Sequence, residues 1–129
     1  MILKCLIVED SAFMREIYRY SLAANINLQI VAEAQDGVQA LKLIKEIQPD
    51  ILILDLVLPL KNGFDVLREM AVVSPKTKVV VISSLDDDSS ILKAKALGAI
   101  VYLKKPFTKI ELLDAINEVS KFYAGVDNG

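Results

Sequence analysis

Residues that could bind a cation and accept a phosphoryl group follow the short apolar runs of this 129-residue chain. Glu9 and Asp10 follow the first run, and Asp55 follows the run at 51–54. Ser83 follows the run at 79–82, and Lys105 lies just after the run at 100–103. In an open parallel α/β sheet, residues at the carboxyl ends of strands converge at one edge, where ligands bind. These groups therefore predict a site built from carboxylates, a hydroxyl and an ammonium group.

Asp55 is the candidate nucleophile of this site. A carboxylate at the end of a hydrophobic strand is unfavourable unless something compensates it, and carboxylates can form aspartyl phosphate. Glu9 and Asp10 would add two carboxylates that repel Asp55 unless a hard divalent cation gathers their oxygens. Mg²⁺ is the expected ion because it prefers oxygen ligands and phosphate. The competing interpretation is that Asp55 only caps a helix or turn.

Composition excludes several classes of function. The chain contains no histidine, which rules out imidazole-based triads, imidazole zinc sites and a phosphohistidine carrier. Cys5 is the single cysteine, so no internal disulfide forms, and we expect it to be a small core residue. The net charge of −2 gives no general reason to bind nucleic acid or a membrane surface. The apolar runs are too short to span a bilayer, and we expect a soluble, cytoplasmic protein.

Helical and strand patterns alternate along the whole chain, without repeats or linkers. Strands are expected at 2–8, 28–32, 51–54, 79–82 and 100–103, and Glu33 follows the second of them. Helices are expected at 12–24, 37–47, 64–73, 89–97 and from 108 to about 123. Because a helix follows every strand and the strands at 51–54 and 79–82 are apolar throughout, we expect a doubly wound α/β fold with a parallel sheet.

Helix boundaries carry their own signals. Expected N-terminal caps are Ser11, Asp36 with Gln39, and Thr108 with Glu111. Gly98 is expected in the left-handed conformation after a helix. The helix at 37–47 is expected to bury one apolar stripe, formed by Val38, Leu41, Ile44 and Ile47.

Four motifs make essentially the whole chain resemble a CheY-like receiver domain of two-component response regulators. They are VEDS at 8–11, LDLVLPLKNG at 54–63, VISS at 81–84 and YLKKPF at 102–107. The resemblance implies a flavodoxin-like sheet of five strands in the order 2-1-3-4-5, with five helices. It also implies a receiver domain over residues 1–124 and a flexible tail over 125–129.

The resemblance assigns a role to each acidic residue. Asp55 would be the phosphoacceptor, and Asp10 and Asp55 would ligate Mg²⁺ directly. Glu9 would act mostly through water, and the backbone carbonyl of Val57 would supply a further ligand.

The resemblance also names the residues that would stabilise and read the phosphoryl group. Lys105 would supply positive charge, and a cis peptide bond before the following proline is common in the family. Its neighbour Lys104 is expected to be solvated. Ser83 and Ser84 both lie at a strand end, and the family pattern selects Ser83 as the hydroxyl donor. Ser83 and Tyr102 would form a coupled switch, although Tyr102 could instead be a half-buried strand residue.

A receiver of this kind would take its phosphoryl group from a sensor histidine kinase or a histidine phosphotransfer protein. It would then bind a downstream protein through its fourth helix, fifth strand and fifth helix, as a monomer or a phosphorylation-dependent dimer. Nothing after Tyr123 is long enough for an output domain, so action through partners is expected unless the chain is a fragment. Such a domain catalyses only its own phosphorylation and dephosphorylation.

Two positions depart from the family pattern, and alternatives remain open. Val57 and Leu85 are apolar where family members often carry polar groups that handle the attacking water, which predicts slow self-dephosphorylation. An aspartate-based phosphatase would want an acid at position 57, and an FMN carrier would not place Glu9 and Asp10 in its phosphate loop. A phosphorylation-independent interaction module of the same fold is the remaining alternative. The acidic run Asp86–Asp88 is better explained by helix capping than by a second metal site.

Overall fold

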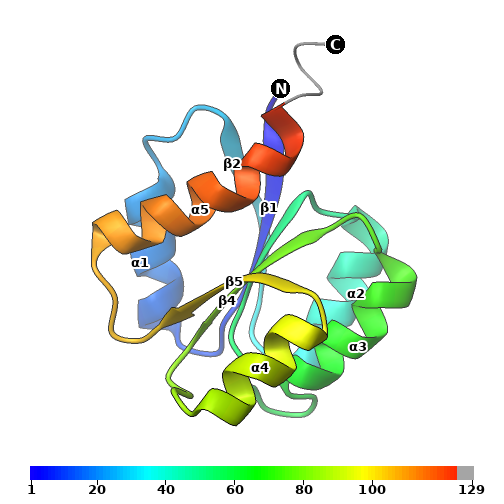
Figure 1. The fold of residues 1–129 in the computed structure, drawn as a ribbon. Coiled ribbons are helices and arrows are strands. Elements are labelled where there is room, and N and C mark those ends of the chain that lie inside the picture. Colours follow the sequence, from blue (N-terminus) through cyan, green and yellow to red (C-terminus); the bar gives the residue numbers. More distant parts are fainter. Residues whose placement is uncertain (125–129) are drawn as a thin grey trace.

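The computed structural model describes residues 1–124, and the predicted tail at 125–129 lies outside the described residues. Five strands alternate with five helices along this part of the chain (Figure 1). The strands are β1 (Leu3–Val8), β2 (Leu28–Ala34), β3 (Ile51–Leu54), β4 (Lys78–Ser83) and β5 (Ala99–Lys104). The helices are α1 (Ala12–Leu22), α2 (Gly37–Ile47), α3 (Gly63–Val73), α4 (Asp88–Ala96) and α5 (Lys109–Ala124).

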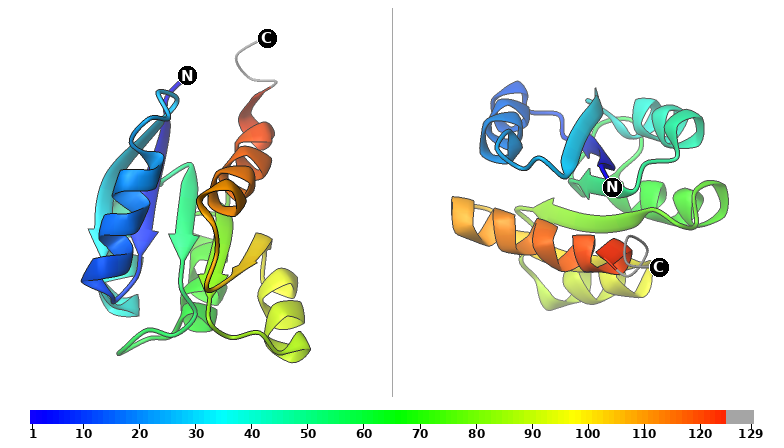
Figure 2. Two further views of the ribbon diagram at one scale, coloured as in Figure 1. Left: turned by 90° about the vertical axis from the view of Figure 1, so that its left-hand side faces the viewer. Right: turned by 90° about the horizontal axis from the view of Figure 1, so that it is seen from above.

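The strands form one parallel sheet in the order β2-β1-β3-β4-β5, which confirms the predicted order. Helices α1 and α5 cover one face, and α2, α3 and α4 cover the other (Figures 1 and 2). Parallel strands need long crossovers, and each helix here supplies one. All five strands therefore end at the same edge of the sheet.

Each face of the sheet has its own hydrophobic core. Alternate residues of β1 divide between the two, with Leu6 and Val8 on the side of α2 to α4 and Cys5 and Ile7 on the side of α1 and α5. Every residue of β3 is buried, as expected for a central strand covered on both faces. Cys5 is fully buried, as predicted, and burial raises the pKa of its thiol to about 12.

The capping predictions are confirmed at both ends of the chain. The Ser11 hydroxyl accepts the amide of Met14 at the start of α1. Thr108 and Glu111 exchange side-chain to backbone hydrogen bonds at 2.9 and 3.1 Å before α5. Gly98 has φ +114°, in the left-handed region that favours glycine.

Two local predictions were wrong. Val38 is exposed, because α2 buries Gly37 and Ala40 together with Ile44 of the predicted stripe, and this rotation turns Val38 outward. The cause is close packing at the start of α2, where a Cβ added to Gly37 would lie 2.0 Å from the carbonyl oxygen of Lys61. In addition, β2 extends to Ala34, so Glu33 lies within the strand and not after it.

No helix among the described residues has the length and apolar character needed to cross a membrane. The longest, α5, has 16 residues and carries charged side chains such as Glu111 and Lys121. Its buried face consists of Leu112, Ala115, Ile116 and Val119, and it packs on the sheet.

Candidate functional site

Three carboxylates meet where β1 and β3 end. Glu9 and Asp10 follow β1, and Asp55 follows β3, the neighbouring strand. The amide of Asp55 donates to the carbonyl of Val8 at 3.0 Å, which holds the two strand ends together. One carboxylate oxygen from each acid lies within 4.8 Å of the others. The strand register therefore produces the predicted acidic cluster.

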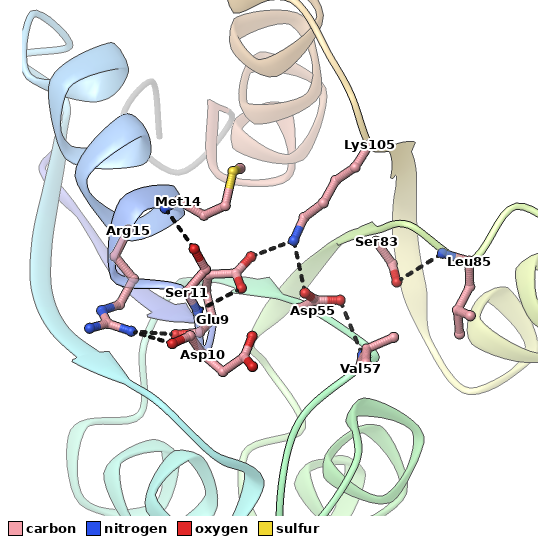
Figure 3. A network of polar contacts seen from close by, with 10 residues as sticks. All are labelled: Glu9, Asp10, Ser11, Met14, Arg15, Asp55, Val57, Ser83, Leu85 and Lys105. Atoms are coloured by element: carbon pink, nitrogen blue, oxygen red, sulfur yellow. Dashed lines mark hydrogen bonds and ion pairs between the residues drawn. The ribbon is translucent and has the colours of Figure 1, made fainter.

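Lys105 enters this cluster from the loop after β5 (Figure 3). Its Nζ lies 2.6 Å from Oε1 of Glu9 and 2.9 Å from Oδ2 of Asp55. The Glu9 and Asp55 residues are 1% and 5% exposed, whereas Asp10 is exposed to solvent. Lys104, by contrast, is exposed, in agreement with the prediction that it is solvated. The two buried acids therefore share one ammonium group.

The electrostatics of the cluster are unbalanced. Burial raises the pKa of Glu9, and the nearby charge of Asp55 adds to this effect, although Lys105 and the amide of Ser11 oppose it. Burial alone would lower the pKa of Lys105, but its hydrogen bonds to Asp55 and Glu9 outweigh this and raise it. One lysine cannot neutralise three carboxylates, so the cluster retains negative charge.

A divalent cation fits this donor set. The three available ligand atoms are carboxylate oxygens, the ligand type that Mg²⁺ prefers, and Asp10 is open to the water molecules that Mg²⁺ retains. Asp55 is already oriented, because its Oδ1 accepts the amide of Val57 at 3.1 Å. The role of the Val57 carbonyl as a ligand stays a prediction.

The loop after Asp55 is held by a close approach of Gly63. A Cβ on Gly63 would lie 2.5 Å from the carbonyl oxygen of Asp55, so any larger residue would displace the backbone that carries the carboxylate. The amide of Gly63 also donates to the carbonyl of Leu56 at 2.9 Å. On the other side of the site, the peptide bond between Lys105 and Pro106 is cis, as the resemblance led us to expect.

Comparison with known proteins agrees with this geometry. The family model described as the response regulator receiver domain matches residues 5–117. This chain belongs to the response regulator receiver family. It is 32% identical over 118 residues to the chemotaxis protein CheY of Thermotoga maritima, covering 92% of this chain and 98% of that protein.

The chain is also similar to one part of a longer protein and to an isolated receiver domain. The chain is 39% identical over 105 residues to protein-glutamate methylesterase/protein-glutamine glutaminase 5 of Myxococcus xanthus, covering 81% of this chain but 30% of that protein. The receiver domain of AraT, a response regulator from Geobacillus stearothermophilus, superimposes with a TM-score of 0.89 at 30% identity. That match covers 98% of this chain and 99% of the AraT domain.

The predicted switch residues of this receiver lie on β4 and β5, the next two strands of the sheet after β3. Ser83 at the end of β4 is fully buried, whereas Ser84 is exposed. The hydroxyl of Ser83 accepts the amide of Leu85 at 3.3 Å, and the hydroxyl of Tyr102 donates to the carbonyl of Leu85 at 2.5 Å. Burial raises the pKa of Tyr102. Leu85 thus contacts both predicted switch residues through its backbone.

An apolar groove of about 480 Å³ borders Lys105. Its lining residues come from α1 and from the segments after β4 and β5, and they are Phe13, Met14, Ile17, Ser84, Lys105, Pro106 and Phe107. The ring of Phe107, one of these lining residues, stacks on the ring of Tyr18 with centroids 5.9 Å apart. The groove gives a partner an apolar surface next to the acidic cluster.

Arg15 of α1 is a site residue that was not predicted from the sequence. Its Nη1 donates to the backbone carbonyls of Glu9 and Asp10, at 2.8 and 3.2 Å (Figure 3). The only signal in the sequence is an arginine five residues after Asp10, which places it on the first turns of the following helix. A helical arginine is so often solvated that this spacing alone does not identify the contact.

Proposed function

We propose that this receiver domain accepts a phosphoryl group on Asp55 in a reaction that requires Mg²⁺. The observation that carries the proposal is the buried arrangement of Asp55, Glu9 and Lys105, with Lys105 paired to both acids. Burying such a charged group is unfavourable for stability alone, because desolvation opposes the gain from pairing. The presence of this buried charged group next to the exposed acid Asp10 is explained if the site carries out phosphoryl transfer.

The donor would be a phosphohistidine of a sensor histidine kinase or a histidine phosphotransfer protein. An oxygen of Asp55 attacks phosphorus, the bond between phosphorus and the imidazole nitrogen breaks, and the imidazole leaves with that electron pair. Asp10, Asp55 and the Val57 carbonyl would hold Mg²⁺ directly and Glu9 mostly through water, and the ion would supply positive charge near the phosphoryl oxygens. Lys105 supplies further positive charge, and the Val57 amide keeps Asp55 oriented for attack.

The groove beside Lys105 supports a protein donor. An imidazole can reach Asp55 only if its carrier contacts the rim of the site, and that rim includes exposed Phe13 and the half-buried side chains of Met14 and Ile17. Apolar side chains next to a charged cluster suit a protein partner. Such a partner can dock on the apolar side chains and react at the charged cluster.

Signalling would follow as a population shift at the α4, β5 and α5 surface. Ser83 would move toward the phosphoryl group, and Tyr102 would change its position with it. The contacts of both residues with the Leu85 backbone support such coupling. The changed surface would bind a downstream protein, with the chain acting as a monomer or as a phosphorylation-dependent dimer. The cytoplasmic location stays a prediction.

The first experiment is intact mass spectrometry after incubation with acetyl phosphate and Mg²⁺. We expect a gain of one phosphoryl group, about 80 Da, on wild-type protein and no gain on Asp55→Asn or without Mg²⁺. If acetyl phosphate and a panel of phosphorylated histidine kinases all fail to label folded wild-type protein, the proposal is wrong. The phosphorylation-independent interaction module would then be favoured.

The two serines after β4 allow a matched test of the hydroxyl donor. Ser83→Ala removes a buried hydroxyl, and Ser84→Ala removes an exposed one. We expect the phosphorylation rate to fall about tenfold or more for Ser83→Ala and to stay near wild type for Ser84→Ala. Equal rates for the two variants would remove Ser83 from the proposed mechanism.

The proposed lifetime of the aspartyl phosphate is long. Val57 is exposed and Leu85 is partly buried, and neither side chain can hydrogen-bond to a water that attacks phosphorus. We expect Val57→Asn to shorten the lifetime of the label. Loss of the label from wild-type protein within seconds would contradict slow self-dephosphorylation.

A further inference from the structure

Arg15 joins the two peptide groups that carry the acidic pair. Its Nη1 donates to the carbonyl oxygen of Glu9 at 2.8 Å and to that of Asp10 at 3.2 Å. The Arg15 side chain is only 13% exposed, so its contacts are shielded from water on most sides. Figure 3 shows the guanidinium group beside the backbone of Glu9 and Asp10, with dashed lines marking these contacts.

The other edge of the guanidinium group is anchored to the sheet. Its Nε lies 3.3 Å from Oε1 of Glu33, and Glu33 belongs to β2, directly opposite Ile7 of β1. The planar guanidinium group has several N–H donors in fixed directions, so one side chain can hold a carboxylate and two carbonyls together. Arg15 therefore ties the β1–α1 loop to the neighbouring strand β2.

Fixing these two carbonyls constrains the acidic side chains. The carbonyl of Glu9 belongs to the peptide that joins Glu9 to Asp10, and the carbonyl of Asp10 belongs to the next peptide. Their orientation determines the direction in which the Cβ of Asp10 leaves the backbone. Asp10 is exposed, and within residues 1–124 its carboxylate forms no hydrogen bond or ion pair, so its direction depends on the backbone.

We propose that Arg15 is a positioning residue for the divalent cation, acting through the backbone of Glu9 and Asp10. The inference rests on the proposed function of the acidic cluster as a Mg²⁺ site. Groups that orient metal ligands from behind commonly change metal affinity by about 10- to 100-fold when they are mutated. Arg15 would orient the carboxylates of Glu9 and Asp10 by holding their backbone carbonyl groups.

A simple electrostatic effect of Arg15 would have the opposite sign. A cation close to three carboxylates repels a second cation, so removing its charge would strengthen Mg²⁺ binding. Loss of a positioning contact would weaken Mg²⁺ binding, because the carboxylates would have to be ordered when the ion binds. The direction of the affinity change therefore separates the two explanations.

Arg19 provides a matched control. It lies one turn further along α1, and its Nη1 also pairs with Oε1 of Glu33, but it has no contact with the carbonyls of Glu9 or Asp10. Substituting Arg19 or Arg15 with glutamine removes the same charge from the same helix and the same acid. Only the Arg15 substitution removes the contacts to the loop.

The test is a Mg²⁺ titration of wild-type protein, Arg15→Gln, Arg15→Lys and Arg19→Gln, followed by the amide NMR signals of residues 9–11. We expect Arg15→Gln to weaken Mg²⁺ binding about tenfold and Arg19→Gln to leave it within about twofold. Arg15→Lys keeps the charge, but one ammonium group cannot hold Glu33 and both carbonyls, so we expect binding weaker than wild type. Urea unfolding of each variant reports stability separately from affinity.

Unchanged or tighter Mg²⁺ binding by folded Arg15→Gln would overturn the inference, as would equal weakening by Arg19→Gln. If Arg15→Gln does not fold, Arg15→Lys replaces it, because this variant keeps the charge but cannot hold Glu33 and both carbonyls, and its affinity must then fall. Wild-type protein that binds no Mg²⁺ would end both this inference and the proposed function. Wild-type protein that binds Mg²⁺ but is never phosphorylated would end the proposed function alone.

Discussion

The two ends of the sheet carry polar networks of opposite character. At the carboxyl end, Glu9 and Asp55 share the ammonium group of Lys105, and Asp10 completes the acidic cluster. At the amino end, neutral hydroxyl, amide and carbonyl groups bind one another next to Asp50, the residue before β3. Both networks are substantially buried, but they differ in charge.

The amino-end network is fully paired through its hydroxyl groups. The hydroxyl of Thr77 donates to the carbonyl of Pro49 at 2.6 Å and lies 2.7 Å from the hydroxyl of Ser74. The hydroxyl of Tyr123 on α5 donates to the carbonyl of Asp50 at 2.7 Å. These bonds connect the starts of β3 and β4 with the last turn of α5, and no ion is needed to balance them.

The difference separates stability from function within one small fold. A neutral, paired network stabilises the folded state because each buried donor has its acceptor. A network with excess negative charge becomes more stable when it binds a cation. We therefore expect substitutions at the amino end to change stability and substitutions at the carboxyl end to change phosphorylation.

The largest effect is expected for Lys105→Met, which replaces the shared ammonium group with an apolar side chain of similar length. At saturating Mg²⁺, the rate of phosphorylation by acetyl phosphate should fall about 100-fold, because charge on the transferring oxygens is no longer stabilised. Lys104→Met is the control, since Lys104 is exposed and outside the cluster. A wild-type rate for Lys105→Met, measured by the same mass assay, would remove the functional distinction between the two ends.

At the opposite end, Thr77→Val is expected to reduce stability without changing phosphorylation. The substitution leaves the carbonyl of Pro49 and the hydroxyl of Ser74 without this partner, and such a loss costs about 1–3 kcal/mol. Urea unfolding measures the free energy, and Ser89→Ala, which removes an exposed hydroxyl, should change it little. A slower phosphorylation rate in Thr77→Val would show that the two ends are coupled.

Much of the carboxyl end could be predicted from the sequence because strand ends and residue types specify it. Asp55 and Lys105 follow apolar runs, and the order of the strands then brings them together without any need to know side-chain conformations. Asp10 and Glu9 follow from the same argument. The α/β class of the fold was predictable for the same reason, since apolar runs, caps and helical spacing all agree, whereas the order of the strands came from the family resemblance.

Contacts that depend on tertiary packing could not be predicted in this way. Arg15 reaches the loop only because its side chain turns back along α1 while Glu33 holds it from β2. Val38 has the spacing of a core residue, but the small residues Gly37 and Ala40 face the core instead. Hydrophobic periodicity predicts that a helix is present more reliably than it predicts which residues of the helix face the core.

A smaller effect, with a distinct pH dependence, is expected for Glu9→Gln without Mg²⁺. Because burial raises the pKa of Glu9 above its ordinary value of 4.5, the folded protein binds more protons than the unfolded chain between that value and the raised one. Stability therefore falls as pH rises through this window, and Glu9 remains unfavourable at neutral pH. Glutamine avoids this loss.

We expect Glu9→Gln to raise the Tm at pH 7 in EDTA by roughly 2–5 °C, and the gain should shrink as the pH falls toward 4.5. Glu46→Gln changes the same charge on the exposed face of α2 and should show no comparable gain. If Glu9→Gln lowers the Tm at neutral pH, its ion pair with Lys105 outweighs the cost of burial. The carboxyl end would then stabilise the fold, as the amino end does.

The smallest effect is expected for Tyr102→Phe, which tests whether a neutral hydrogen bond at the carboxyl end behaves like those at the amino end. The variant loses the bond from the Tyr102 hydroxyl to the carbonyl of Leu85 but keeps the ring. Tyr102 is only partly buried, so water can replace the lost donor and the cost should be about 0.5–1 kcal/mol. Urea unfolding should detect this loss, while the rate of phosphorylation at Asp55 stays near wild type. A changed rate would mean that loss of the Tyr102 hydrogen bond affects Ser83 through the backbone of Leu85. Tyr102 would then belong to the reactive network and not to the stabilising one.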